Sequence, residues 1–144
     1  MPTELVRDTY TAADGLDDIE RLAADAEVSL EAAANRLVGL ADDTTVLLVL
    51  EVMHKPADTR ALRRGETVKP KLRVRYCVAN QTDCFVPKFK SAEDRSVLVK
   101  ALKSLASKRA VEPLPGSAAP LYEIEAQSYP FAERERVLAL AWPR

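Results

Sequence analysis

The chain has 144 residues, of which 47% are hydrophobic and 30% are charged, and its formal net charge is -1. This composition suits one ordinary domain or two very small ones, and it excludes a disordered chain, a collagen-like repeat and a disulfide-stapled miniprotein. The longest aliphatic run, Val46 to Leu50, falls far short of the roughly 20 residues of a membrane-spanning helix. The first residues carry no export signal, so we expect a cytoplasmic protein without a membrane partner.

The residue inventory also limits the chemistry. The single histidine, His54, and the two cysteines, Cys77 and Cys84, are too few for an HExxH zinc site or a four-cysteine zinc site. The four glycines form no phosphate-binding loop, and the sequence has no nucleophile elbow. We therefore expect no catalytic residues, no metal and no cofactor.

Charge is distributed unevenly along the chain. Residues 1–44 contain 11 acidic and three basic residues and have a net charge of -8. Residues 55–109 contain 15 basic and five acidic residues and have a net charge of +10. Such asymmetry indicates either two parts of the chain that attract each other or a basic surface for an anionic partner.

Two short helices are predicted near the N-terminus. Apolar residues at helical spacing, with acidic residues in the first turn, favour a helix over residues 16–26. Ser29 is well suited to cap a second helix, whose apolar repeat extends to Leu40. The pair has a helix-turn-helix shape, but its surface is acidic where DNA-reading helices are basic, so a packing role is favoured.

Three strands are predicted next. Residues 45–54 are apolar at both odd and even positions, which indicates a central strand covered on both faces. Residues 72–79 alternate clearly, and residues 84–90 are predicted to return as an edge strand because they contain Pro87. The alternation places Leu72, Val74, Tyr76 and Val78 on one face, and Arg73, Arg75 and Cys77 on the other.

The last third of the chain is predicted to contain a helix and a hairpin. Ser91 begins a capping pattern for a helix with an apolar stripe formed by Leu98, Ala101, Leu102 and Leu105. An irregular connection rich in proline follows. Residues 121–129 and 135–142 are typical of a closing hairpin, in which the cross-strand ion pairs are expected to join Glu123 and Glu125 to Arg134 and Arg136.

The element order from residue 45 is therefore β-β-β-α-β-β. This order predicts the α+β class, with a mostly antiparallel sheet and a helix on one face.

The N-terminal third carries a family pattern, in which a Met-Pro start precedes a helical pair with the pattern Leu-Ala, Val-Ser and Arg-Leu-x-x-Leu. The matching residues are Met1, Pro2, Leu22, Ala23, Val28, Ser29, Arg36, Leu37 and Leu40. This pattern resembles the end of the metallopeptidase domain in the ImmA/IrrE family. In its radiation-response members a C-terminal domain similar to a GAF sensor follows, so the resemblance implies a helical pair at 1–44 and a GAF-like α+β domain at 45–144.

The family's HExxH helix lies upstream of the Met-Pro stretch, and this sequence lacks it. The resemblance thus implies a non-catalytic regulatory or sensor part of a stress-response protein, which binds a small effector or a protein partner. One alternative is the C-terminal part of a zinc metallopeptidase whose catalytic half is on another chain. A homodimer is an alternative for the protein partner.

Two sets of residues are candidate sites. Cys77 and Cys84 are expected on one sheet face beside Arg73 and Arg75, whose guanidinium groups would favour thiolates and a redox pair; two reduced structural thiols are the alternative. The second set is a basic stretch suited to the phosphate backbone of nucleic acid, although a solvated loop also explains it. Its members are Arg60, Arg63, Arg64, Lys69, Lys71, Arg73, Arg75, Lys88 and Lys90.

Overall fold

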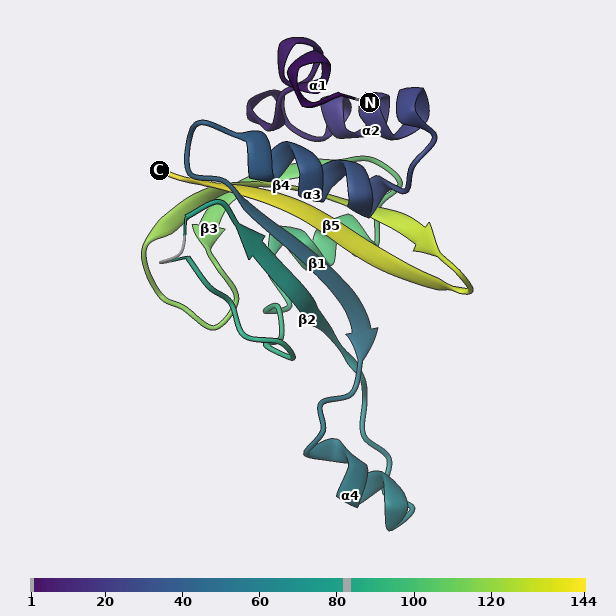
Figure 1. Cartoon of the computed structure of the whole chain (residues 1–144). Helices are drawn as coiled ribbons and strands as arrows, with labels where there is room; N and C mark the ends of the chain where they lie inside the picture. Colours follow the sequence, from purple (N-terminus) through teal and green to yellow (C-terminus); the bar gives the residue numbers. More distant parts are fainter. Residues whose placement is uncertain (1, 82–83) are drawn as a thin grey trace.

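The computed structural model describes residues 2–81 and 84–144. In chain order, the elements are α1 (Thr3–Thr9), the 3-10 helix η1 (Ala12–Asp14), α2 (Leu16–Ala26), α3 (Leu30–Leu40), β1 (Val46–Met53), α4 (Asp58–Arg63), β2 (Lys71–Ala79), α5 (Val97–Leu102), β3 (Lys108–Pro113), β4 (Leu121–Phe131) and β5 (Arg134–Pro143). The protein is α+β: N-terminal helices precede a five-stranded antiparallel sheet on which the short helix α5 packs (Figure 1). The strand order is β2-β1-β5-β4-β3.

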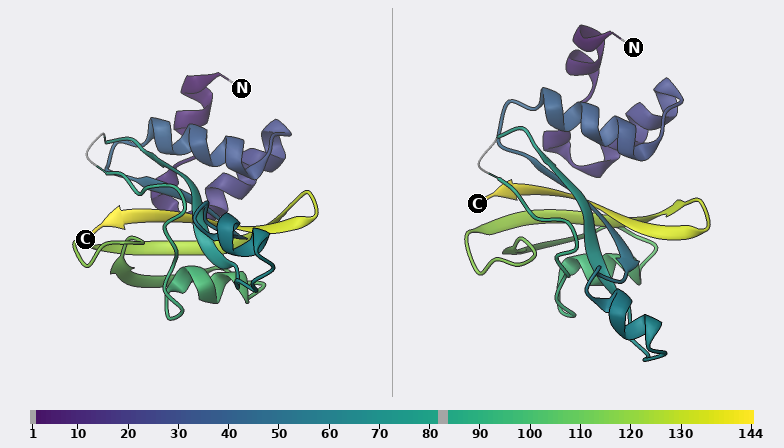
Figure 2. Two further views of the ribbon diagram at one scale, coloured as in Figure 1. Left: turned by 90° about the horizontal axis from the view of Figure 1, so that it is seen from below. Right: turned by 60° about the horizontal axis from the view of Figure 1, so that its bottom comes forward.

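The sheet separates two helical layers (Figure 2). Helices α2 and α3 cover one face, with α1 on their outer side, and α5 covers the other face. Leu47 and Val49 of β1 lie in the core beneath the N-terminal helices, whereas Leu48 and Leu50 lie in the core beneath α5. The prediction of a central strand covered on both faces is confirmed, because β1 lies between β2 and β5 and each of its faces meets a helical layer.

Both predicted N-terminal helices are confirmed. The helix predicted over residues 16–26 is α2, and the Ser29 hydroxyl accepts a hydrogen bond from the Ala32 amide at 3.1 Å to cap α3. The chain enters α2 through Gly15, whose φ is 90°, and the Leu16 amide donates to the Glu125 carboxylate at 2.9 Å. A residue of β4 thus caps α2 and fixes the helical layer on the sheet.

The third predicted strand is misplaced. Residues 84–90 form no strand, because Pro87 lacks an amide hydrogen and Phe89 has a φ of 73°. The segment 89–92 forms backbone hydrogen bonds and one bridge with the edge of β2. The third strand of the chain is β3, at the opposite edge of the sheet, so the observed order from residue 45 is β-α-β-α-β-β-β.

The helix predicted to open at Ser91 begins later. Ser91 forms a bridge with Arg73, and Ser96 is the N-cap residue of α5. Glu112 of β3 accepts hydrogen bonds from the Ser96 hydroxyl at 2.6 Å and the Val97 amide at 2.7 Å. Contact with β3 therefore determines where α5 starts, and Leu105, expected on its apolar stripe, lies beyond its end and is fully exposed.

The predicted alternation along residues 72–79 is wrong after Val74. The register between β1 and β2 shifts, so that Leu50 pairs with Val74 but Val49 pairs with Tyr76, and Arg75 is the extra residue of a β-bulge. Leu72, Val74 and Cys77 therefore contact the core beneath α5, while Tyr76 and Val78 contact the core beneath the N-terminal helices. The bulge brings the Tyr76 hydroxyl to the face covered by α3.

The C-terminal hairpin is confirmed as β4 and β5, but its expected ion pairs are wrong. In the observed register, Glu123 lies opposite Trp142 and Glu125 lies opposite Leu140. Both glutamates instead bind Arg109, which belongs to β3 on the other side of β4. The expected ion pairs were wrong because β3, the neighbouring strand that supplies the counter-charge, was missing from the predicted sheet.

The connection between β1 and β2 is a projecting arm, defined here as residues 55–71. It contains α4, which stands clear of the sheet in Figure 1 and buries none of its own residues. In the described part of the chain, no helix is both long and apolar enough to cross a bilayer.

Candidate functional site

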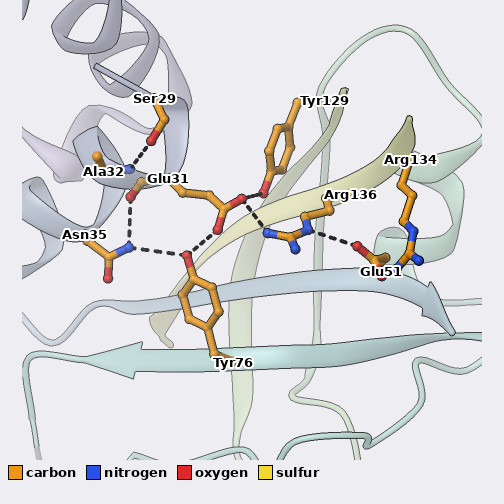
Figure 3. Close-up of polar contacts among 9 residues, drawn as sticks. All are labelled: Ser29, Glu31, Ala32, Asn35, Glu51, Tyr76, Tyr129, Arg134 and Arg136. Carbon is orange, nitrogen blue, oxygen red and sulfur yellow. Dashed lines mark hydrogen bonds and ion pairs between the residues drawn. The ribbon is translucent and has the colours of Figure 1, made fainter. Parts of the chain in front are cut away.

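A group of polar side chains lies where α3 meets the sheet, and we term it the polar cluster (Figure 3). Its members are Glu31 of α3, Glu51 of β1, Tyr76 of β2, Tyr129 of β4, and Arg134 and Arg136 of β5. The cluster therefore joins one helix to four strands.

Arg136 is at the centre of the polar cluster. Its Nε lies 3.0 Å from Glu51 Oε1, and its Nη1 lies 2.8 Å from Glu31 Oε2. The other oxygen of Glu51 accepts a hydrogen bond from Arg134 Nη1 at 3.0 Å. The side chains of Glu51 and Arg136 are 2% and 8% exposed, whereas that of Arg134 is 70% exposed. One arginine is thus buried between two carboxylates, and the second closes the cluster on the solvent side.

Glu31 connects α3 to three strands. Its carboxylate accepts hydrogen bonds from the Tyr76 hydroxyl at 2.6 Å, the Tyr129 hydroxyl at 2.5 Å and the Arg136 guanidinium. Asn35, one turn further along α3, also lies 3.3 Å from the Tyr76 hydroxyl. The Tyr76 contact depends on the β-bulge, because regular alternation would place that ring beneath α5.

The pKa values of the carboxyl and tyrosine groups in the polar cluster lie far from neutral pH. Burial opposes ionisation of Glu31 and Glu51, but hydrogen bonds from the tyrosines and arginines outweigh it and lower the pKa of both carboxyls. Burial and the bond to Glu31 raise the pKa of Tyr76 to about 12 and also raise the pKa of Tyr129. Ionised carboxylates and protonated tyrosines suit the joining of structural elements better than proton transfer at pH 7.

An open cavity of about 500 Å³ adjoins the polar cluster, and we term it the arginine concavity. It is lined by Glu51, Arg75, Phe131, Ala132, Glu133, Arg134 and Arg136. The Arg136 guanidinium carbon lies 3.5 Å from the centroid of the Phe131 ring, and Phe131 remains 42% exposed. The concavity thus combines three guanidinium groups with one aromatic wall.

Arg75 has no hydrogen bond or ion pair within the ranges that the structure describes. It is half-buried at the β-bulge and lines the concavity beside Arg134. Glu51 is already neutralised by two arginines, so Arg75 is the guanidinium of the concavity that remains available to a ligand.

The structure divides the predicted basic stretch between several places. Arg60 and Arg63 are exposed on α4 and Arg64 is exposed at its C-cap. Lys69 lies further along the arm, and Lys71 is both the last residue of the arm and the first residue of β2. Arg73 is buried and donates to the carbonyl oxygens of Met53 and Phe89 at 3.1 and 3.0 Å.

The remaining basic residues lie away from the arm. Arg75 belongs to the concavity, while Lys88 and Lys90 lie in the connection that follows β2. The side chain of Lys90 lies against Gly116, at the turn between β3 and β4.

Both cysteines are free and half-buried, and they contact the core on the α5 side of the sheet. Burial, with a smaller effect of Cys84, raises the pKa of the Cys77 thiol. This is opposite to the direction expected from neighbouring arginines. The bulge turns Cys77 toward the core beneath α5, whereas Arg75 lines the concavity and Arg73 donates to backbone carbonyls. The predicted turn before Cys84 includes residues 82 and 83, which lie outside the described residues.

Sequence reasoning missed the polar cluster and the arginine concavity. One available signal was Glu51, a lone acidic residue in a strand predicted to be covered on both faces, since a buried carboxylate requires a counter-charge.

No protein-family model matches the chain, and comparison with curated proteins finds no match either. Among the described residues, no group of three or more histidine, cysteine, aspartate and glutamate side chains could hold a metal ion.

Proposed function

We propose that the chain is a non-catalytic regulatory part of a stress-response protein of the ImmA/IrrE type, with a helical pair at 1–44 and a GAF-like sensor domain at 45–144. In this proposal it binds a small effector or a protein partner. The observation that carries the proposal is the double role of Arg136, which lines the arginine concavity and is bonded to Glu31 of α3.

This arrangement supports a sensor because a bound ligand and the helical layer would share one residue. A ligand in the arginine concavity contacts Arg136, and any change in the hydrogen bonds of Arg136 alters the attachment of α3 to the sheet. The glutamates of the polar cluster have lowered pKa values and Tyr76 has a raised one, so none of these groups is poised to exchange a proton at pH 7. This favours a binding role over acid-base catalysis.

The test mixes the purified chain with an ImmA/IrrE-type zinc peptidase and the repressor that this peptidase cleaves. We expect the chain alone to leave the repressor intact, with or without Zn²⁺, and to change the cleavage rate when it is added to the peptidase. Cleavage by the chain alone that stops on adding a chelator would overturn the non-catalytic part, and an unchanged rate at excess chain would overturn the regulatory part. Restoration of cleavage on mixing with an inactive HExxH-bearing half would favour the split-peptidase alternative.

A second candidate function is nucleic-acid binding by the projecting arm. Residues 55–71 contain six basic and two acidic residues, and Arg60, Arg63 and Arg64 are exposed in α4 and at its C-cap. Within the described residues, the only ion pair of these arginines joins Arg64 to Glu66 at 3.5 Å, so the arm does not neutralise the acidic N-terminal helices. Clustered cations on a protruding element are suited to a phosphate backbone.

The test for this candidate titrates duplex DNA at about 50 and 200 mM salt, the range in which phosphate contacts lose most of their affinity. The variant Arg60→Gln/Arg63→Gln/Arg64→Gln is expected to lose the low-salt binding. The matched control, Lys100→Gln/Lys103→Gln/Lys108→Gln, removes the same charge from exposed positions on and after α5 and is expected to retain it. Absence of binding at low salt in the unmodified chain rejects this function.

A further inference from the structure

We propose that the arginine concavity binds a small organic anion, a phosphate monoester or a carboxylate, that carries a flat apolar group. The inference rests on the proposed regulatory function, since it names the class of effector. The site is formed by the bulge of β2, which supplies Arg75, and by the β4–β5 turn, which supplies Phe131, Glu133 and Arg134.

The size of the concavity fits a small molecule. Its volume of about 500 Å³ lies within the range of small-molecule sites, roughly 300–1,000 Å³. Its walls come from β1, β2 and the β4–β5 hairpin, all parts of one hydrogen-bonded sheet. A site built on paired strands is held in shape before the ligand arrives, which reduces the ordering that binding requires.

The charges of the concavity favour an anion. Glu51 accepts one hydrogen bond on each oxygen from Arg134 and Arg136, so its charge is already compensated inside the protein. Arg75 has no partner among the described residues, and Arg134 uses only Nη1 in its bond to Glu51. A guanidinium group presents a planar fork of donors that fits a carboxylate or a phosphate.

The aromatic wall selects for a flat apolar group on the anion. One face of Phe131 is covered by the Arg136 guanidinium, yet 42% of the residue is exposed in a concavity whose other walls are mostly charged. An apolar group placed against this ring would remove its surface from water. Glu133 is the one exposed carboxylate of the concavity, and it opposes the anion.

Calorimetric titrations of the whole chain test the proposal, with phenyl phosphate and benzoate as the two anionic probes. Two compounds serve as controls: inorganic phosphate carries the anionic group without the ring, and phenol carries the ring without the anionic group. We expect phenyl phosphate or benzoate to bind more tightly than either control, and the stronger of the two identifies the anionic group. Saturable binding by neither anion would overturn the proposal.

Two variants locate the site. Arg75→Gln is expected to weaken binding of the stronger probe about tenfold, the usual effect of losing a charge-assisted hydrogen bond. Glu133→Gln is expected to strengthen binding, because it removes the opposing carboxylate. The matched control Arg60→Gln, which removes the same charge from α4, is expected to change nothing; equal weakening by Arg60→Gln and Arg75→Gln would show only non-specific attraction and overturn the proposal.

Amide NMR shifts of the unmodified chain provide a readout that needs no variant. The probe is expected to shift the amides of residues 74–76 and 131–136 and to leave those of α4 unchanged, and shifts confined to α4 would contradict the site. Failure of both probes together with a changed peptidase rate would reject this inference alone. Binding of a probe with an unchanged peptidase rate would reject the regulatory function alone.

Discussion

The Arg136 guanidinium lies 2.8 Å from the Glu31 carboxylate, although 105 positions separate the two residues in the chain. Elsewhere the N-terminal helices are held on the sheet mainly by apolar packing. Leu37 and Val38 of α3, for example, belong to the same buried cluster as Leu138 of β5. The polar cluster is therefore the place where the attachment of α3 depends on charge.

Replacement of Arg136 by methionine is expected to destabilise the protein by about 3–5 kcal/mol, because Glu51 and Glu31 are then buried without their main counter-charge. Arg134→Met removes an exposed partner of the same Glu51 and is expected to cost about 0–1 kcal/mol. Urea unfolding of the two variants measures both values. Equal losses in the two variants would contradict the central position of Arg136.

Stability is expected to fall in acid through Glu31 and Glu51. Their folded-state pKa values are lowered from the ordinary value of 4.5, so the folded protein binds fewer protons than the unfolded chain. Their contribution is present above the unfolded pKa and is lost as the pH falls through the folded pKa. Unfolding free energies of the unmodified chain and of Glu31→Gln are expected to converge on going from about pH 5 to pH 3, and a constant difference would disprove this assignment.

Gly15→Ala is expected to destabilise the protein by about 1–3 kcal/mol. The φ of Gly15 is 90°, and an added Cβ would lie 2.9 Å from Glu125 Oε2, the carboxylate that caps α2. Gly39→Ala is the matched control, because nothing lies within 4 Å of its Cβ position in α3, and it is expected to stabilise by roughly 0.5–1 kcal/mol. Thermal unfolding distinguishes the opposite signs of the two changes.

Cys77 is expected to react several-fold more slowly with iodoacetamide at neutral pH in the folded protein than in urea. Its raised pKa reduces the thiolate fraction, and its side chain contacts the core beneath α5. The measurement uses the Cys84→Ser variant, so that Cys77 is the thiol whose alkylation is measured. Fast alkylation of the folded variant, or a Cys77–Cys84 disulfide after mild peroxide treatment of the unmodified chain, would instead favour the redox pair.

Elements determined by local patterns were predicted well. The helix at 16–26, the Ser29 cap, the buried strand at 45–54 and the C-terminal hairpin each follow from neighbouring residues in the sequence. β3 was missed because Lys108 to Pro113 shows no strand alternation of its own, and its pairing with β4 makes it a strand. The start of α5 was misplaced for a related reason, since Glu112 of that strand supplies the capping carboxylate.

The sequence by itself determined the α+β class, the N-terminal helical pair and the segregation of charge, because spacing of apolar residues and local capping act within a few residues of chain. Only the tertiary structure decided the β-bulge at Arg75, the partners of Glu31, Glu51 and Arg136, and hence the arginine concavity. Register between strands and the choice of an ion partner depend on which distant segments pack together, and a buried charge takes the partner that the packing brings within reach.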